Sequence, residues 1–155
     1  FMLNYNGFQA IECSVIWHDY ILSAVVRKRK RIDLSLLKSR KLNVETELNS
    51  FIDKFEKKEV AIWGAGHQSL AVMSLAKLEN KIRYVVDSAP FKQGKYTPAT
   101  HFPIVAPIEL VNNPVKAVII IAASYSNEVA RIMKNTYQHI KYVVIVEDTG
   151  LRDIS

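Results

Sequence analysis

Two glycines and a distant aspartate have the spacing of an anion-binding turn. Gly64 and Gly66 lie in the segment 62–69 (IWGAGHQS), between an apolar run and a helical pattern, and Asp87 ends the next apolar run. Backbone N–H groups and the dipole at a helix N-terminus favour a bound phosphate or other anion. An acidic residue after the second strand can accept a hydrogen bond from a ribose or sugar hydroxyl. The pattern predicts ligand contacts from Gly64, Ala65, Gly66, His67, Gln68, Ser69 and Asp87.

Each of these residues also has a structural interpretation. The two glycines can serve only a tight turn between a strand and a helix. His67 can be a solvated first-turn residue, and Asp87 can cap the loop that begins at Ser88. Both interpretations stay open at the level of the sequence.

A second group of polar side chains lies in the segment 88–107, which is rich in Pro, Lys and Gly. Lys92, Lys95 and Tyr96 have the chemistry for phosphate and ring contacts. His101 can act on a substrate or bridge loop carbonyls, and loop fastening is favoured because no carboxylate adjacent in sequence would activate it as a base. A long ordered loop in a compact domain is usually functional. The alternative is a solvated loop ordered by its prolines alone.

A third group follows the most apolar run of the chain, 115–122. Ser124, Tyr125 and Asn127 come directly after it, where open α/β sheets place their ligands. Ser126 or Asn127 can equally cap the following helix, and both roles can hold at once. No catalytic residue is assigned within the chain.

Alternating strands and helices are the elements expected to position these groups. The apolar runs predict strands at 60–63, 82–86, 115–122 and 142–146, with helices at 69–78 and 127–137 between them. Such alternation predicts parallel strands joined by right-handed crossovers. The third strand is so apolar that burial on both faces is expected. The predicted fold class is therefore α/β, a Rossmann-like, mostly parallel sheet flanked by helices.

The first thirty residues predict an antiparallel hairpin. Residues 1–6 are typical of the last turn of a helix stopped by Gly7, and 8–17 and 20–26 read as strands with a short connection. A lone hairpin is marginal in water. We therefore expect it to lie on this domain, on another chain or on a domain outside this sequence.

A helical connector is expected after the hairpin. Between residues 43 and 58, apolar residues recur at spacings of three and four, and Asn43 is the expected N-cap. The face that should pack on the sheet comprises Val44, Leu48, Phe51, Ile52 and Phe55.

Composition narrows the class of protein. A chain of 155 residues, 49% hydrophobic and 23% charged, can bury one ordinary core. The start lacks a secretory pattern and no apolar run approaches membrane-spanning length, so a cytoplasmic protein without membrane contact is expected. Cys13 is the only cysteine and the four histidines lack metal-ligand spacing, so no metal site is expected. The net charge of +6 is concentrated in 27–31, where a solvated strand end is favoured over a nucleic-acid site.

The segment 86–98 (VDSAPFKQGKYTP), continued by His101, Pro103, Ile104, Val105 and Pro107, carries a resemblance to a known family. It resembles the signature of the C-terminal domain of S-adenosylmethionine-dependent C-methyltransferases, including those that act on nucleotide-linked deoxysugars. The resemblance covers roughly residues 43 to 147. Residues 1–31 are similar to the final helix and last two strands of the class I methyltransferase domain that precedes this module.

The resemblance implies a division of labour. Residues 1–31 are expected to be a remnant of the preceding domain, 32–58 a helical connector, and 59–155 a Rossmann-like substrate-binding domain. In such enzymes S-adenosylmethionine and the proton-abstracting groups belong to earlier segments, so this chain is expected to bind no cofactor and to be inactive alone. Its partners would be a nucleotide-sugar-like substrate and the missing N-terminal domains. Ala123 and Ser124 depart from the family's frequent aromatic-Asn pair, which bears on sugar specificity.

Two other function classes remain. A nicotinamide-dependent oxidoreductase domain is compatible with the glycine turn and Asp87, but no Tyr-x-x-x-Lys pair accompanies them. A non-catalytic nucleotide-sugar-binding module would resemble the small domains that precede some sugar acyltransferases. The faces of the hairpin could also pair two copies of the chain into a homodimer.

Overall fold

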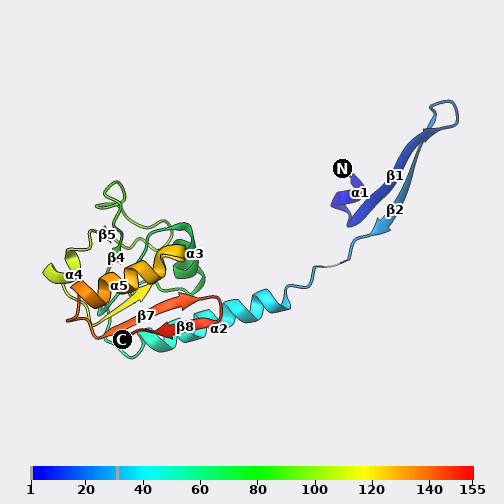
Figure 1. Ribbon diagram of the computed structural model, residues 1–155. Helices are drawn as coiled ribbons and strands as arrows, with labels where there is room; N and C mark the ends of the chain where they lie inside the picture. Colours follow the sequence, from blue (N-terminus) through cyan, green and yellow to red (C-terminus); the bar gives the residue numbers. More distant parts are fainter. Residues whose placement is uncertain (1, 31) are drawn as a thin grey trace. The chain divides into compact units, whose positions relative to one another are not determined.

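The computed structural model describes residues 2–30 and 32–155 and divides the chain into two compact units, Phe1–Ser35 and Leu36–Ser155 (Figure 1). Phe1 and Arg31, which the expected N-terminal helix and the basic run include, lie outside the described residues. Among the described helices, none combines the length and apolar character that crossing a bilayer requires.

The first unit is an antiparallel hairpin preceded by one helical turn. Helix α1 (Met2–Tyr5) ends before Gly7, whose φ of +83° suits the position after a helix. Strands β1 (Phe8–Ile16) and β2 (Ile21–Lys28) pair antiparallel, with a bulge between Ala10 and Glu12. The expected hairpin is confirmed.

The second unit is built on a six-stranded sheet in the order β5-β4-β3-β6-β7-β8. Five strands are parallel, and β8 runs antiparallel to β7. The strands are β3 (Val60–Trp63), β4 (Val85–Val86), β5 (Ile104–Val105), β6 (Ala117–Ile120), β7 (Tyr142–Glu147) and β8 (Gly150–Asp153). The mostly parallel α/β sheet predicted from the sequence is confirmed.

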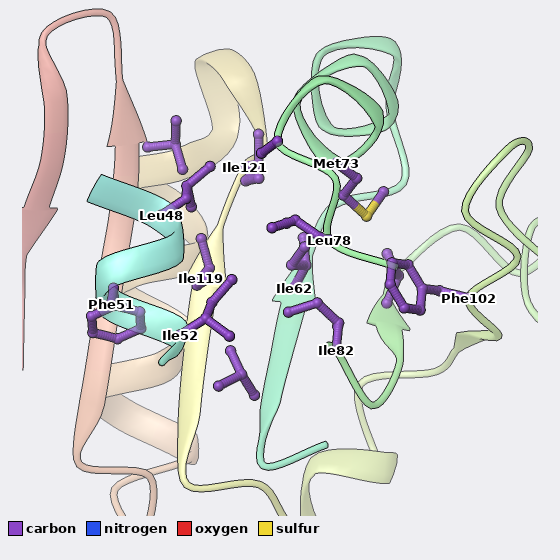
Figure 2. Close-up of a cluster of buried hydrophobic side chains, with 14 of the residues drawn as sticks. Leu48, Phe51, Ile52, Ile62, Met73, Leu78, Ile82, Phe102, Ile119 and Ile121 are labelled. Atoms are coloured by element: carbon purple, nitrogen blue, oxygen red, sulfur yellow. The ribbon is translucent and has the colours of Figure 1, made fainter. Parts of the chain in front are cut away.

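Helices cover both faces of this sheet. Helices α2 (Ser35–Ile52) and α3 (His67–Leu75) pack on one face, where Leu48 and Met73 meet Ile62 and Ile119 (Figure 2). Helices α4 (Glu109–Asn112) and α5 (Ser126–Thr136) pack on the other. Every residue of β3 and β6 is buried. For β6 the continuous apolar run of 115–122 predicted this burial.

Helix α2 begins earlier than the sequence indicated. It starts at Ser35, whose N–H donates to Asp33 Oδ1 at 2.9 Å, and it ends at Ile52 rather than near residue 58. The prediction of Asn43 as N-cap was wrong, because Asn43 lies inside the helix and its amide donates to Glu47 Oε1 (2.9 Å) and Thr149 O (3.0 Å). Apolar periodicity marks only the half of α2 that packs on the sheet. The preceding half is exposed and leaves no such signal.

Four short elements were not predicted. Strand β5 and helix α4 lie in or directly after the segment read as a loop, the 3₁₀ turn η1 (Ala123–Tyr125) follows β6, and β8 follows β7 after a two-residue turn. The second predicted strand, 82–86, also shrinks to the two residues of β4. Elements of two to four residues are too short for a helical or strand period to show.

Candidate functional site

The sheet has a topological switch point between β3 and β6. From β3 the chain adds β4 and then β5 on one side, whereas β6 and then β7 lie on the other. Helix α3 follows β3 on one face and α5 follows β6 on the opposite face. The carboxyl ends of these two neighbouring strands form the place where open α/β sheets bind ligands. We call this place the β3–β6 edge.

Gly64 is required by the packing of this edge. Its φ is +126°, and a Cβ there would lie 2.2 Å from the carbonyl oxygen of Ile121, directly after β6. A side chain at this position meets both backbone strain and a steric clash. The interpretation of Gly64 as a residue that the tight turn requires therefore agrees with its backbone conformation and its packing.

Gly66 is different, because nothing in the packing demands a glycine there. Its φ of −93° and ψ of 174° suit any residue, and an added Cβ would meet no atom within 4 Å. Gly66 is the N-cap of α3, and the first intrahelical bond runs from Leu70 N to Gly66 O. The N–H groups of His67, Gln68 and Ser69 precede that bond and have no intrahelical acceptor. The turn thus leaves open space beside a row of backbone donors.

The side chains in the first turn of α3 differ in their exposure to solvent. His67 and Gln68 are exposed, whereas Ser69 is fully buried. Within the described residues, Ser69 Oγ has no hydrogen-bond partner. Ser69 occupies the third position of the Gly-x-Gly-x-x-Ser pattern, where a small residue allows a helix to pack closely on its strand.

Asp87 ties the glycine turn to the segment that follows β4. It is buried, and its Oδ2 accepts hydrogen bonds from Ala65 N and Lys92 Nζ while Oδ1 accepts one from Ala89 N, all at 2.9 Å. Burial raises the pKa of Asp87, but hydrogen bonds from Ala89, Lys92 and Ala65 outweigh it and hold the pKa below its ordinary value. The loop-capping interpretation is present in the structure, and Lys92 is engaged by Asp87.

The segment 88–103, which we call the flap, does not cover the β3–β6 edge. Gly94 N donates to Ile104 O and Ile104 N donates to Lys95 O, so the flap runs antiparallel along the outer side of β5. Tyr96 bridges to Pro103, before the first residue of β5, so the rest of the flap lies towards the amino end of that strand. This backbone pairing carries Lys95, Tyr96 and His101 away from the edge.

The part of the flap beyond Tyr96 is held by side-chain hydrogen bonds, and a cavity lies beside the flap at Lys95 and Tyr96. The buried hydroxyls of Thr97 and Thr100 lie 2.8 Å apart, and Phe102 N donates to Thr97 Oγ1 at 2.9 Å. Within the described residues the exposed His101 imidazole has no hydrogen bond, so these hydroxyls do the fastening expected of it. Lys95 and Tyr96 line a cavity of about 300 Å³ beside β5.

The residues after β6 lie at the β3–β6 edge as the sequence predicted. Ser124 and Tyr125 belong to the 3₁₀ turn η1 (Ala123–Tyr125), and their side chains are exposed. Ser126 Oγ accepts a hydrogen bond from Ala122 N at 3.2 Å, which holds the turn between β6 and α5. Asn127 is exposed in the first turn of α5.

The sequence analysis did not identify Arg152 and Glu147, which join Asn127 in a hydrogen-bonded group. Arg152, on β8, donates from Nη2 to Asn127 Oδ1 at 2.8 Å and from Nε to Glu147 Oε1. Arg152 reaches Asn127 only because β8 folds back beside β7. The turn-forming Asp148-Thr149-Gly150 sequence directly after the apolar run 142–146 was the signal for a chain reversal here.

A second cavity adjoins the N-terminus of α3. It has a volume of about 290 Å³ and lies between α2, α3 and the end of β7. Gln68 contributes to its wall, together with apolar side chains such as Leu37 and Val72 and charged ones such as Arg40 and Glu45. As for metals, the described residues contain no cluster of three or more His, Cys, Asp or Glu side chains that could hold an ion.

Comparison with known proteins adds a family and a fold. A family model described as the C-methyltransferase C-terminal domain matches residues 35–146. Among solved structures, the chain is similar to UDP-D-quinovosamine 4-dehydrogenase from Vibrio fischeri, with 17% sequence identity and a TM-score of 0.50. That alignment covers 64% of this chain and 95% of the other, and at this identity the likeness shows the fold alone. A search of curated proteins gave no match.

Proposed function

The chain belongs to the family of C-methyltransferase C-terminal domains, and from this premise we propose that Leu36–Ser155 is the substrate-binding module of a methyltransferase that uses S-adenosylmethionine. Its substrate is a small metabolite with an anionic group, such as a nucleotide-linked sugar. The module binds and orients this substrate at the β3–β6 edge, and methyl transfer takes place on other parts of the enzyme.

The open N-terminus of α3 is the observation that carries this proposal. Gly64 is explained by its contact with Ile121, but the structure gives no packing reason for Gly66. Gly66 lies beside helix N–H groups that have no intrahelical acceptor, at the switch point of the sheet. Close approach of a ligand to these groups would account for a glycine that packing does not require. The first turn of α3 contains no acidic residue, so an anion placed there meets no repulsion from that turn.

S-adenosylmethionine itself does not fit this edge. The cofactor carries a positive sulfonium and no phosphate, whereas the N-terminus of α3 favours negative charge. We therefore assign no step of the cofactor's chemistry to this unit.

A direct test is a matched pair of methyl additions on α3. Gly66→Ala places a methyl group in the space proposed for the ligand, at φ and ψ that alanine adopts without strain. Ser74→Thr adds a methyl group on the exposed side of the same helix. Calorimetric titration with UDP-glucose and with pyrophosphate should show at least a tenfold loss of affinity for Gly66→Ala and none for Ser74→Thr, with both melting temperatures unchanged.

The same titrations separate this proposal from a nicotinamide-dependent oxidoreductase. Because Asp87 is engaged by Ala65, Ala89 and Lys92, NADH should bind more weakly than UDP-glucose. Tighter binding of NADH than of UDP-glucose would favour the oxidoreductase. Equal affinity of the wild type and Gly66→Ala for every probe would refute the proposed binding site.

We further propose that the hairpin unit completes the methyltransferase domain that precedes this module in related enzymes. Ile11, Val15 and Leu22 are 60%, 54% and 70% exposed on the hairpin, which is unusual for several neighbouring apolar residues in a complete domain. In a longer chain that includes the preceding domain, these side chains should be protected from covalent surface labelling. A concentration-dependent dimer with the same protection in the 155-residue chain would instead indicate pairing of two copies.

A further inference from the structure

We propose that Arg152 is a positioning residue that fixes the side-chain amide of Asn127, so that Asn127 offers only N–H donors to an uncharged oxygen acceptor of the ligand. This inference rests on the proposed function and deepens it, because it assigns an orientation to the bound molecule. Its anionic group lies at the N-terminus of α3 and its uncharged, oxygen-bearing part lies at the start of α5.

The strand register brings Arg152 to the correct side of the sheet. Arg152 pairs with Ile145 of β7, and the side chain of Ile145 belongs to the core beneath α5. Directly paired residues in an antiparallel ladder point to the same face, so Arg152 also projects on the α5 side. From there its Nη2 lies 2.8 Å from Asn127 Oδ1, and its Nε bonds to Glu147.

The chemistry of guanidinium fixes the direction of the amide. A guanidinium group only donates hydrogen bonds, so its partner on Asn127 must be the amide oxygen. The amide NH₂ group then points away from Arg152, and within the described residues it has no acceptor. Glu147 accepts a second hydrogen bond from the guanidinium, which favours this orientation of Arg152.

The charges around Asn127 select an uncharged acceptor. Glu128 follows it in the first turn of α5, Glu147 lies beyond Arg152, and Asp148 comes next along the chain. With Arg131, one helical turn further along α5, the nearby side chains comprise two cations and three carboxylates. The excess negative charge disfavours a phosphate there, whereas a carbonyl or ring oxygen of a base or sugar can accept from the amide.

The role of Arg152 is therefore indirect. The amide oxygen and nitrogen of asparagine have almost the same size, so without Arg152 the group can rotate and present its oxygen to the ligand. A carbonyl or ring oxygen of the ligand has no hydrogen to donate, so the two facing acceptor oxygens repel each other. Loss of Arg152 should thus weaken binding of the uncharged part of the ligand even though Arg152 itself does not touch it.

The test uses three variants of the full 155-residue chain and two probes. Asn127→Asp keeps an oxygen for Arg152 but removes the N–H donors, and Arg152→Gln releases the amide. Lys134→Gln removes an exposed cation two helical turns from Asn127 on α5, as a control. UDP-glucose affinity should fall about tenfold in Asn127→Asp and three- to tenfold in Arg152→Gln. Pyrophosphate affinity should stay within twofold in all three variants.

The double variant and the free protein provide further readouts. Adding Arg152→Gln to Asn127→Asp should cost no further affinity, because both changes remove the same donor. In the ligand-free protein, the side-chain amide signals of Asn127 in ¹⁵N NMR spectra should shift in Arg152→Gln and stay in place in Lys134→Gln. Unchanged Asn127 signals in Arg152→Gln would overturn the positioning role.

The outcomes separate this inference from the function on which it rests. If the wild type binds neither probe, or if Gly66→Ala has no effect, the proposed function fails and the orientation fails with it. If Gly66→Ala weakens both probes while Asn127→Asp leaves UDP-glucose unaffected, only the present inference is wrong. An equal loss of pyrophosphate and UDP-glucose affinity in Asn127→Asp would show a general charge effect and would also refute it.

Discussion

Asp87→Asn is expected to destabilise the second unit strongly, and the loss can be worked out from its contacts. Asparagine can keep one oxygen for Ala89 N, but its NH₂ group would then face the Ala65 N–H and the Lys92 ammonium, where Oδ2 now accepts from both. A hydrogen bond to a charged group contributes about 1.5–3 kcal/mol, and a buried N–H left without a partner costs about 1–3 kcal/mol. Lys92 is partly exposed and can regain water, so its pair adds less than about 1 kcal/mol.

The free energy of unfolding is therefore expected to fall by about 3 kcal/mol in total. For a domain of this size, that loss lowers the melting temperature by roughly 10 °C. Thermal unfolding followed by circular dichroism at pH 7 measures it. Asp53→Asn is the matched control, because Asp53 pairs with Lys81 at the same 2.9 Å but is 63% exposed. Its loss should stay below about 1 kcal/mol.

The dependence on pH supplies an independent check. Because the folded pKa of Asp87 lies below its ordinary value of 3.8, the stabilisation is present above that value and is lost as the pH falls from there through the folded pKa. The difference between the wild type and Asp87→Asn should therefore shrink below about pH 3.8. A loss under 0.5 kcal/mol at pH 7 (about a third of the smallest bond counted above), or a gap that persists unchanged in acid, would refute this account of Asp87.

Three further substitutions test the edge and the flap. Gly64→Ala should lower the free energy of unfolding by several kcal/mol, because its Cβ would collide with Ile121 O; an unchanged urea midpoint would contradict this. Ser69→Ala should be neutral or stabilising by about 1 kcal/mol in urea denaturation, since it removes a buried unpaired hydroxyl; weaker UDP-glucose binding would instead assign that hydroxyl to the ligand. Thr97→Val should cost about 1–2 kcal/mol, whereas His101→Ala should leave the melting temperature within about a degree, and the reverse order would restore the fastening role of the imidazole.

The sheet and half of the candidate site could be predicted because their signals are local. Apolar runs identified both β3 and β6 as strands and β6 as buried on both faces, and the glycine turn located the N-terminus of α3. The capping role of Asp87 was visible as an alternative because it acts on Ala89, two residues away. Each of these features depends on residues that are close together in the sequence.

The remaining features depend on pairings that a single sequence does not display. The direction of the flap is set by backbone hydrogen bonds between Gly94, Lys95 and Ile104, which leave no mark on side-chain periodicity. Likewise, Arg152 and Asn127 meet only through the β7–β8 hairpin, and β8 is too short to predict from its pattern. Tertiary pairing, rather than residue type, decides which polar side chains reach the edge.

The close approach of Gly64 to Ile121 has a consequence for how a ligand is received. With the backbone of one loop seated directly against the carbonyl of the other, the two loops cannot separate without breaking the end of the parallel ladder, where Ile121 N donates to Trp63 O. A ligand therefore binds to a rim formed by loops that are already ordered, so little of its binding free energy is offset by the entropy cost of ordering them. Adaptation to substrates of different shape falls to exposed side chains such as Tyr125, which stand on that rim.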